Sequence, residues 1–138
     1  MIVLDTHAWV RWLHPELGHK LPDALRNWLE TTDDSLAVSV ISALEVAQLV
    51  KKRTLELPLP MPEWFDEALA GSGIACLPVT PALLYSSTAL PDIHKDPADR
   101  IIIATAIAHG ARLVTADETI WSYPNLSTTW VNPPGARA

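Results

Sequence analysis

MIVLDTHAWVRWL, the stretch formed by residues 1–13, contains two kinds of hydrophobic pattern in direct succession. The three consecutive apolar residues at positions 2–4 are typical of a buried strand, and after Asp5 the apolar residues recur at helical spacing. The order strand, acid, helix places the Asp5 carboxylate at the carboxyl end of a strand. Ligands bind at such ends in open α/β sheets.

The rest of the chain repeats this alternation. Strands are expected at 36–41, 74–79 and 113–114, with an edge strand at 128–131. Helices are expected at 21–29, 42–53, 63–70, 80–90 and 97–109. Strands that alternate with helices imply a parallel sheet covered on both faces. The predicted fold class is therefore α/β, a three-layer α/β/α sandwich with a central parallel sheet.

The length and composition indicate one globular domain, because the chain has 138 residues, of which 49% are hydrophobic and 19% charged. We expect this domain to span residues 1–132, followed by a flexible tail at 133–138. The single cysteine, Cys76, excludes an intramolecular disulfide and is interpreted as a small core residue. No apolar run approaches the roughly 20 residues that span a bilayer, and Asp5 comes too early for a signal peptide. A cytoplasmic protein is expected.

Four acids lie where the predicted strands turn into helices, and we expect them to converge on one rim of the sheet: Asp5, Glu45, Asp99 and Asp117. Crowded carboxylates raise one another's pKa unless a cation neutralises them. Their hard oxygen ligands suit Mg²⁺ or Mn²⁺. Asp5 is the hardest of the four to explain structurally, because it stands between an apolar strand and an apolar helix.

Simpler readings compete for the other acids. Ser42-x-x-Glu45 matches the sequence pattern of a capping box, in which the Glu45 carboxylate accepts a hydrogen bond from the backbone N–H of Ser42. Asp96 before Pro97 is favoured as a helix N-cap, and Asp99 in the first turn suits the helix dipole. Asp117 has the alternative of an ordinary turn residue.

Other polar and aromatic residues carry weaker signals. Surface or helix-end positions are expected for the histidines, which show no ligand spacing: His7, His14, His19, His94 and His109. Core or interface positions are expected for Trp9, Trp12 and Trp28. Arg100 either pairs locally with Asp99 or contacts a substrate phosphate. The net charge of −6 argues against broad electrostatic attraction to nucleic acid.

Four segments, in order and spacing, resemble the PIN-domain VapC toxins over nearly the whole chain: Val3-Leu4-Asp5-Thr6-His7, Ser39 to Val46, His94 to Ala106, and Leu113-Val114-Thr115-Ala116-Asp117. The resemblance implies a ribonuclease that cuts RNA with Mg²⁺ or Mn²⁺. It assigns the catalytic and metal-binding roles to Asp5, Glu45, Asp99 and Asp117. It adds supporting roles for Thr6, Asp96 and Thr115. It also implies a homodimer neutralised by a VapB-type antitoxin.

Rival functions fit the residues less well. A haloacid-dehalogenase-type phosphotransferase would have a second acid at position 7, where this chain has His7. A receiver-like domain would have paired acids near the end of the first strand. The remaining alternative is a PIN-like interaction or regulatory module without nuclease activity, against which the complete set of four acids argues.

Overall fold

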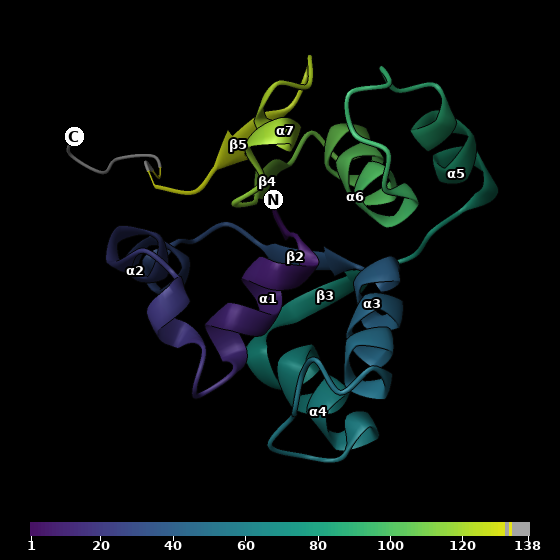
Figure 1. The fold of residues 1–138 in the computed structure, drawn as a ribbon. Helices are drawn as coiled ribbons and strands as arrows, with labels where there is room; N and C mark the ends of the chain where they lie inside the picture. Colours follow the sequence, from purple (N-terminus) through teal and green to yellow (C-terminus); the bar gives the residue numbers. More distant parts are fainter. Residues whose placement is uncertain (132, 134–138) are drawn as a thin grey trace.

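The computed structural model describes residues 1–131 and 133, and a five-stranded sheet lies between two groups of helices (Figure 1). The strands are β1 (Ile2–Leu4), β2 (Leu36–Ser39), β3 (Ile74–Leu77), β4 (Arg112–Val114) and β5 (Ser127–Thr129). Their order across the sheet is β3-β2-β1-β4-β5, and every pairing is parallel. The predicted three-layer α/β sandwich is confirmed.

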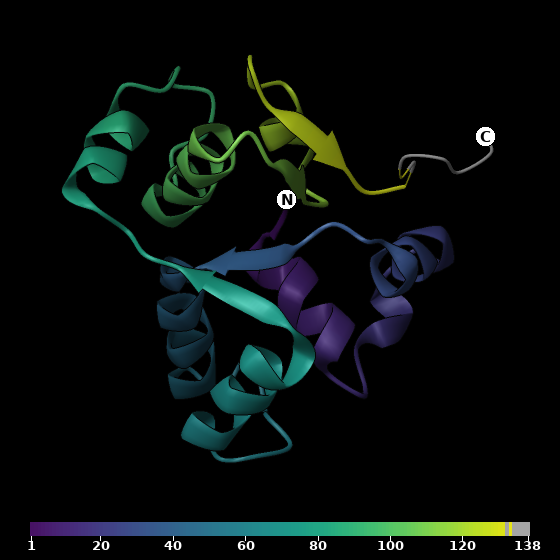
Figure 2. The same ribbon diagram turned by 180° about the vertical axis from the view of Figure 1, so that it is seen from behind.

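The helices divide between the two faces of the sheet, as the two opposite views show (Figures 1 and 2). One face carries α1 (Thr6–Leu13), α2 (Asp23–Thr31), α3 (Val40–Lys51) and α4 (Met61–Ala68). The other carries α5 (Pro81–Thr88), α6 (Pro97–Ala108) and α7 (Glu118–Trp121). Short 3-10 turns lie at η1 (Gly18–Lys20) and η2 (Ala70–Ser72). None of the helices in the described part of the chain is long and apolar enough to cross a membrane.

The side chains of β1 show how the sheet separates two hydrophobic cores. Successive residues of a strand point to opposite faces. Ile2 and Leu4 join the core under α1 to α4, whereas Val3 joins the core formed with Ile102 of α6. Trp9, expected in the core or an interface, is fully buried and donates its indole N–H to the carbonyl oxygen of Ala68 at 2.9 Å. Both faces of the central strand are therefore covered.

The strand order places a topological switch point between β1 and β4. The chain leaves β1 toward β2 on one side, and it reaches β4 on the other side only after β3. The carboxyl ends of the two strands are joined where the backbone N–H of Asp5 donates to the carbonyl oxygen of Val114 at 3.1 Å. Open α/β sheets bind ligands at such a point.

Three local expectations differ from the structure. The second strand ends at Ser39 and α3 begins at Val40, about two residues earlier than the sequence indicated. Cys76 is exposed, because β3 is an edge strand that helices cover only in part. The four-residue α7 was not predicted, since one helical turn has no periodicity to detect. The expected flexible tail at 133–138 lies, except for residue 133, outside the described residues.

Candidate active site

Asp5 lies at the junction of β1 and α1. Its backbone is extended and its Oδ1 accepts a hydrogen bond from the backbone N–H of Ala8 at 2.8 Å, so Asp5 is the N-cap of α1. The side chain of Thr115 at the end of β4 also hydrogen-bonds to this carboxyl group. Burial outweighs these bonds and raises the pKa of Asp5. The buried position of Asp5 therefore disfavours its ionised form unless a positive charge lies nearby.

Glu45 lies on the first half of α3 and is held by the neighbouring helix α1. The Thr6 hydroxyl donates to Glu45 Oε1 at 2.5 Å, and its oxygen lies 2.9 Å from that of the buried Ser42. The capping-box reading is wrong, because Ser39 caps α3 and Ser42 is already inside the helix. Burial raises the pKa of Glu45, the Thr6 hydrogen bond opposes this rise, and the charge of Asp96 adds to it.

Asp96 and Asp99 lie at the start of α6. Asp96 is the N-cap, as expected, and its Oδ1 accepts from the backbone N–H of Asp99 at 3.0 Å. Burial, followed by the charges of Asp96 and Glu45, raises the pKa of Asp99 to about 7. Asp99 is therefore the acid whose ionisation the surrounding carboxylates oppose most clearly.

Asp117 follows β4 and caps the short α7. Its Oδ1 accepts from the backbone N–H of Thr119 at 2.9 Å, and its own N–H donates to Thr115 Oγ1 at 3.1 Å. Partial burial acts to raise its pKa, but the hydrogen bonds from His94 and Thr119 together lower the pKa of Asp117. Thr115 thus contacts the carboxyl group of Asp5 and the backbone of Asp117, and the supporting role that the family resemblance implies for it stays a prediction.

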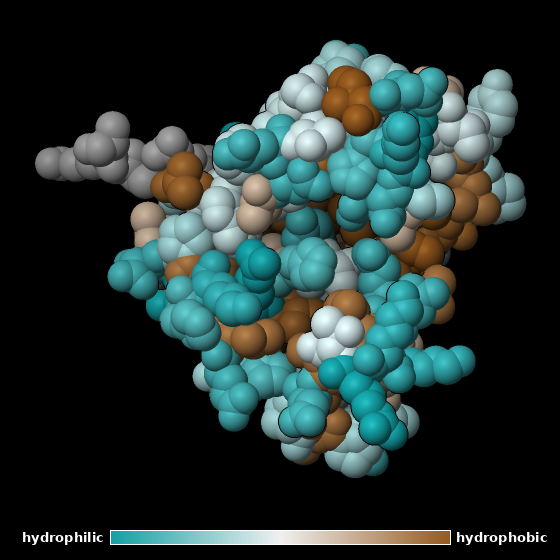
Figure 3. Space-filling view, in the orientation of Figure 1, coloured by the Kyte–Doolittle hydropathy of each residue, from teal (hydrophilic) through white to brown (hydrophobic). Residues whose placement is uncertain are grey.

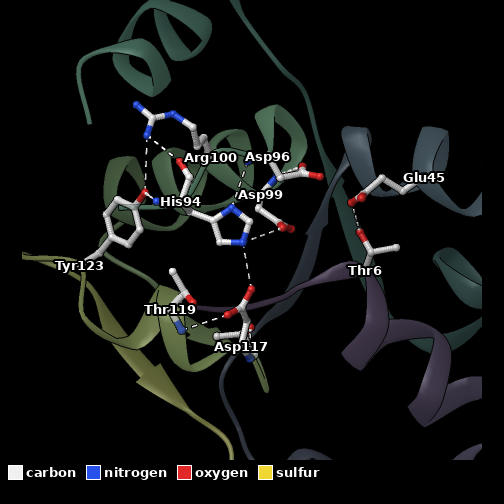
Figure 4. A network of polar contacts seen from close by, with 10 residues as sticks. Thr6, Glu45, His94, Asp96, Asp99, Arg100, Asp117, Thr119 and Tyr123 are labelled. Carbon is white, nitrogen blue, oxygen red and sulfur yellow. Dashed lines mark hydrogen bonds and ion pairs between the residues drawn. The ribbon is translucent and has the colours of Figure 1, made fainter. Parts of the chain in front are cut away.

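His94 is a site residue that the sequence analysis missed. Its Nε2 lies 2.9 Å from Asp117 Oδ2 and 3.2 Å from Asp99 Oδ2 (Figure 4). The expectation of a surface or helix-end histidine is wrong for His94, because the loop before α6 carries it back over the acids. Its closeness in sequence to Asp96 and Asp99 was the only available signal, and no ligand-type spacing accompanied it.

Arg100 lies next to Asp99 but is used by the protein itself. Its guanidinium donates hydrogen bonds of 2.9 to 3.0 Å to the carbonyl oxygens of Ser87 at the end of α5 and of three residues in the loop that follows: Leu90, Pro91 and His94. Its side chain is only 12% exposed. Arg100 therefore fixes the loop that carries His94, and its suggested contact with a substrate phosphate stays a prediction.

Asp99 is shared by two groups of potential metal ligands in the described part of the chain. One group joins it to Glu45 and Asp96, and the other joins it to His94 and Asp117; within each group one ligand atom per residue lies within 4.8 Å of the others. Carboxylate oxygens suit Mg²⁺ and Mn²⁺, and an imidazole nitrogen is compatible with Mn²⁺. The donor set fits a divalent cation. Asp5 belongs to neither group, but it lies close enough for its charge to raise the pKa of both Glu45 and Asp99.

Comparison with known proteins finds a match to the family model described as "PIN domain" over residues 2–124. The chain is also 35% identical to "Ribonuclease VapC22" of Mycobacterium tuberculosis over 133 residues. That alignment covers 94% of this chain and 98% of the relative.

Solved structures with the same fold include VapBC2 from Rickettsia felis bound to a DNA fragment from its promoter, at 22% identity and a TM-score of 0.65. The match covers 94% of this chain and 98% of that one. A toxin–antitoxin complex from Klebsiella pneumoniae matches at 21% identity with a TM-score of 0.65, covering 93% and 97% of the two chains.

Proposed function

Because this chain belongs to the PIN-domain family, we propose that it is a divalent-metal-dependent endoribonuclease and the toxic component of a toxin–antitoxin pair. The 35% identical relative, named a ribonuclease, supports the reaction class. The single observation that carries the proposal is the position of Asp99 between two groups of cation ligands at the topological switch point.

The proposed ion is Mg²⁺ or Mn²⁺, with the four acids Asp5, Glu45, Asp99 and Asp117 as its proposed ligands. When bound, such an ion activates water and stabilises the charge that develops on the phosphodiester and its leaving oxygen. The carboxylates explain the demand for a cation, because burial raises the pKa of Asp5, Glu45 and Asp99. Repulsion by neighbouring carboxylates adds to the rise for Glu45 and Asp99.

The supporting hydroxyls fix the directions of the carboxylates. Thr6 restrains Glu45, and Thr115 connects Asp5 with the turn that carries Asp117. Buried supporting groups of this kind orient metal ligands and hold them in the geometry that the reaction requires. No serine or histidine nucleophile is needed, since the attacking group is water, and the products carry a 5′ phosphate and a 3′ hydroxyl.

The protein partner is proposed to be a VapB-type antitoxin, and the functional unit a homodimer in the cytoplasm. The relative's name and the toxin–antitoxin complexes with the same fold support the antitoxin. Exposed apolar side chains on α3 and α5, namely Val40, Leu44, Leu84 and Tyr85, offer surface for protein contacts. Figure 3 shows hydrophobic surface at the margin of this view near the same two helices.

The test is cleavage of a structured RNA mixture by antitoxin-free protein in Mg²⁺ or Mn²⁺. Asp99→Asn is compared with Asp66→Asn, which changes an exposed acid on α4 in the same way. Cleavage that EDTA and Asp99→Asn abolish, and that Asp66→Asn retains, supports the nuclease. If folded wild-type protein binds the metal but cuts no RNA in a broad panel, the interaction-module alternative replaces it.

A further inference from the structure

We propose that His94 is a positioning residue of the metal site, whose Nε2–H holds the carboxylate of Asp117 against that of Asp99. This inference rests on the proposed function, because it treats those two acids as cation ligands. The family match spans His94, but none of the residue roles predicted from the sequence is assigned to this histidine.

The hydrogen bonds around the ring fix which nitrogen carries the proton. Nδ1 accepts from the backbone N–H of Asp96 at 3.1 Å, and an accepting nitrogen of a neutral imidazole carries no proton. The proton is therefore on Nε2, which faces Asp117 Oδ2 at 2.9 Å and Asp99 Oδ2 at 3.2 Å. The ring presents one donor to two carboxyl groups at once.

Both backbone polar groups of His94 are hydrogen-bonded to side chains of the protein. Its N–H donates to the Tyr123 hydroxyl oxygen at 2.7 Å, and its carbonyl oxygen accepts from Arg100 at 3.0 Å. Figure 4 shows Tyr123 and Arg100 on one side of the ring, with Asp99 and Asp117 to its right and below it. The ring is mostly buried, with 17% of the side chain exposed. A residue anchored this firmly can hold a neighbour in place.

Asp117 needs such a restraint more than the other acids do. Its side chain is 38% exposed and it caps α7, a single turn of helix, whereas Asp99 is within the twelve-residue α6. The hydrogen bond from His94 crosses from one element to the other. A carboxylate offers about four lone-pair directions, so accepting from His94 leaves others for a cation.

The experiment measures Mn²⁺ binding without RNA, by electron paramagnetic resonance and calorimetry, for wild type and three variants. His94→Ala removes the donor, and His94→Gln restores an amide N–H near the position of Nε2. His94→Asn places its amide near the position of Nδ1 and does not reach Asp117. Loss of a group that orients metal ligands costs about tenfold to a hundredfold in metal affinity. We expect that loss in the Ala and Asn variants and a much smaller loss in the Gln variant.

Two further readouts separate positioning from a general structural role. In metal-free protein, nitrogen NMR of the imidazole should show the Nε2–H tautomer. In cleavage assays, His94→Ala should lose kcat at low Mn²⁺, recover it at high Mn²⁺ and keep the wild-type KM for RNA. Unfolding in EDTA checks that each variant folds.

Several results would overturn the proposal: an Nδ1–H tautomer, wild-type Mn²⁺ affinity in His94→Ala, or a Gln variant as weak as the Asn variant. Nitrogen coupling from His94 to bound Mn²⁺ would also overturn it, because the ring would then be a direct ligand. These binding and NMR readouts need no RNA. Failure of the wild type to cut RNA would count against the proposed nuclease and leave the assignment of His94 to be judged separately.

Discussion

Glu45 and Asp117 stand on opposite sides of Asp99, yet their surroundings act on their charges in opposite ways (Figure 4). Glu45 is supported by the neutral Thr6 hydroxyl and faces Asp96, so its pKa is raised, chiefly by burial. Asp117 also loses some hydration, but the hydrogen bonds from His94 and Thr119 lower its pKa below the ordinary value. One side of the site resists negative charge and the other stabilises it.

This difference indicates which carboxylates a bound cation would stabilise most. Asp117 is already stabilised as an anion by groups of the protein. Glu45 and Asp99 have raised pKa values because their charges lack sufficient compensation. A divalent ion near Asp99 would relieve both at once. The expected consequences can be ordered from the largest effect to the smallest.

The largest effect expected is a rise of metal affinity with pH. Since the pKa of Asp99 is about 7, Mn²⁺ must displace a proton from this carboxyl below neutrality. One displaced proton corresponds to about a tenfold gain in affinity per pH unit, levelling off above about pH 7. Calorimetry in two buffers with different ionisation enthalpies gives both the affinity and the proton count. A flat profile with no proton release would contradict this view of Asp99.

The second effect concerns the stability of the metal-free protein. With the folded pKa of Asp99 raised from 3.8 to about 7, the native state binds more protons than the unfolded state across that interval. Stability should therefore fall as the pH rises from about 4 to about 7. Asp99→Asn should remove this loss and stabilise the EDTA-treated protein at pH 8 by up to a few kcal/mol.

Urea unfolding at pH 5 and pH 8 measures this gain, with Asp66→Asn as the control on an exposed acid. A destabilised Asp99→Asn protein at pH 8 would mean that Asp99 has a stabilising partner in the absence of metal. The repulsion among the acids would then be overestimated.

The third effect tests the side of the site that carries Glu45. Thr6→Val keeps the shape of the side chain but removes the hydroxyl that donates to Glu45 and contacts Ser42. Loss of one partner in such a half-buried pair costs about 1–2 kcal/mol. Thermal unfolding measures the cost, and Thr6→Ser should preserve most of the stability. Equal losses in the Val and Ser variants would assign the effect to packing of the methyl group instead.

The sequence predicted the sheet and the start of α6 because local patterns encode both, whereas the metal-binding roles of the four acids stay predictions. The apolar run before Asp5 and the Asp96-Pro97 cap depend only on neighbours in the chain, and the structure has the expected β1 and α6 there. His94 and Ser42 escaped prediction, since their roles arise from contacts across 23 and 36 residues of sequence. Likewise, Cys76 is exposed because of the position of β3 at the sheet edge, which the residues of β3 do not reveal.

The smallest expected effect is a change in the stability of the metal-free protein when Asp117 is substituted, opposite in sign to the change expected for Asp99. Because the pKa of Asp117 is lowered, its ionised form stabilises the fold above its ordinary pKa, and this contribution is lost as the pH falls through the lowered value. Asp117→Asn should therefore slightly destabilise the metal-free protein at pH 7. Partial exposure limits the effect to less than about 1 kcal/mol. Differential scanning calorimetry compares the unfolding temperatures of Asp117→Asn and Asp99→Asn with that of the wild type. If both variants shift the unfolding temperature in the same direction, the two acids do not differ as proposed.

The most direct test of the central claim, that Asp99 is the shared ligand of the metal site, is Mn²⁺ binding to RNA-free protein by electron paramagnetic resonance. The wild type and Asp66→Asn are predicted to bind Mn²⁺ equally, whereas Asp99→Asn is predicted to lose more than about a hundredfold in affinity, beyond the loss typical of a supporting residue. Wild-type affinity in a folded Asp99→Asn protein would contradict the claim and place the metal elsewhere.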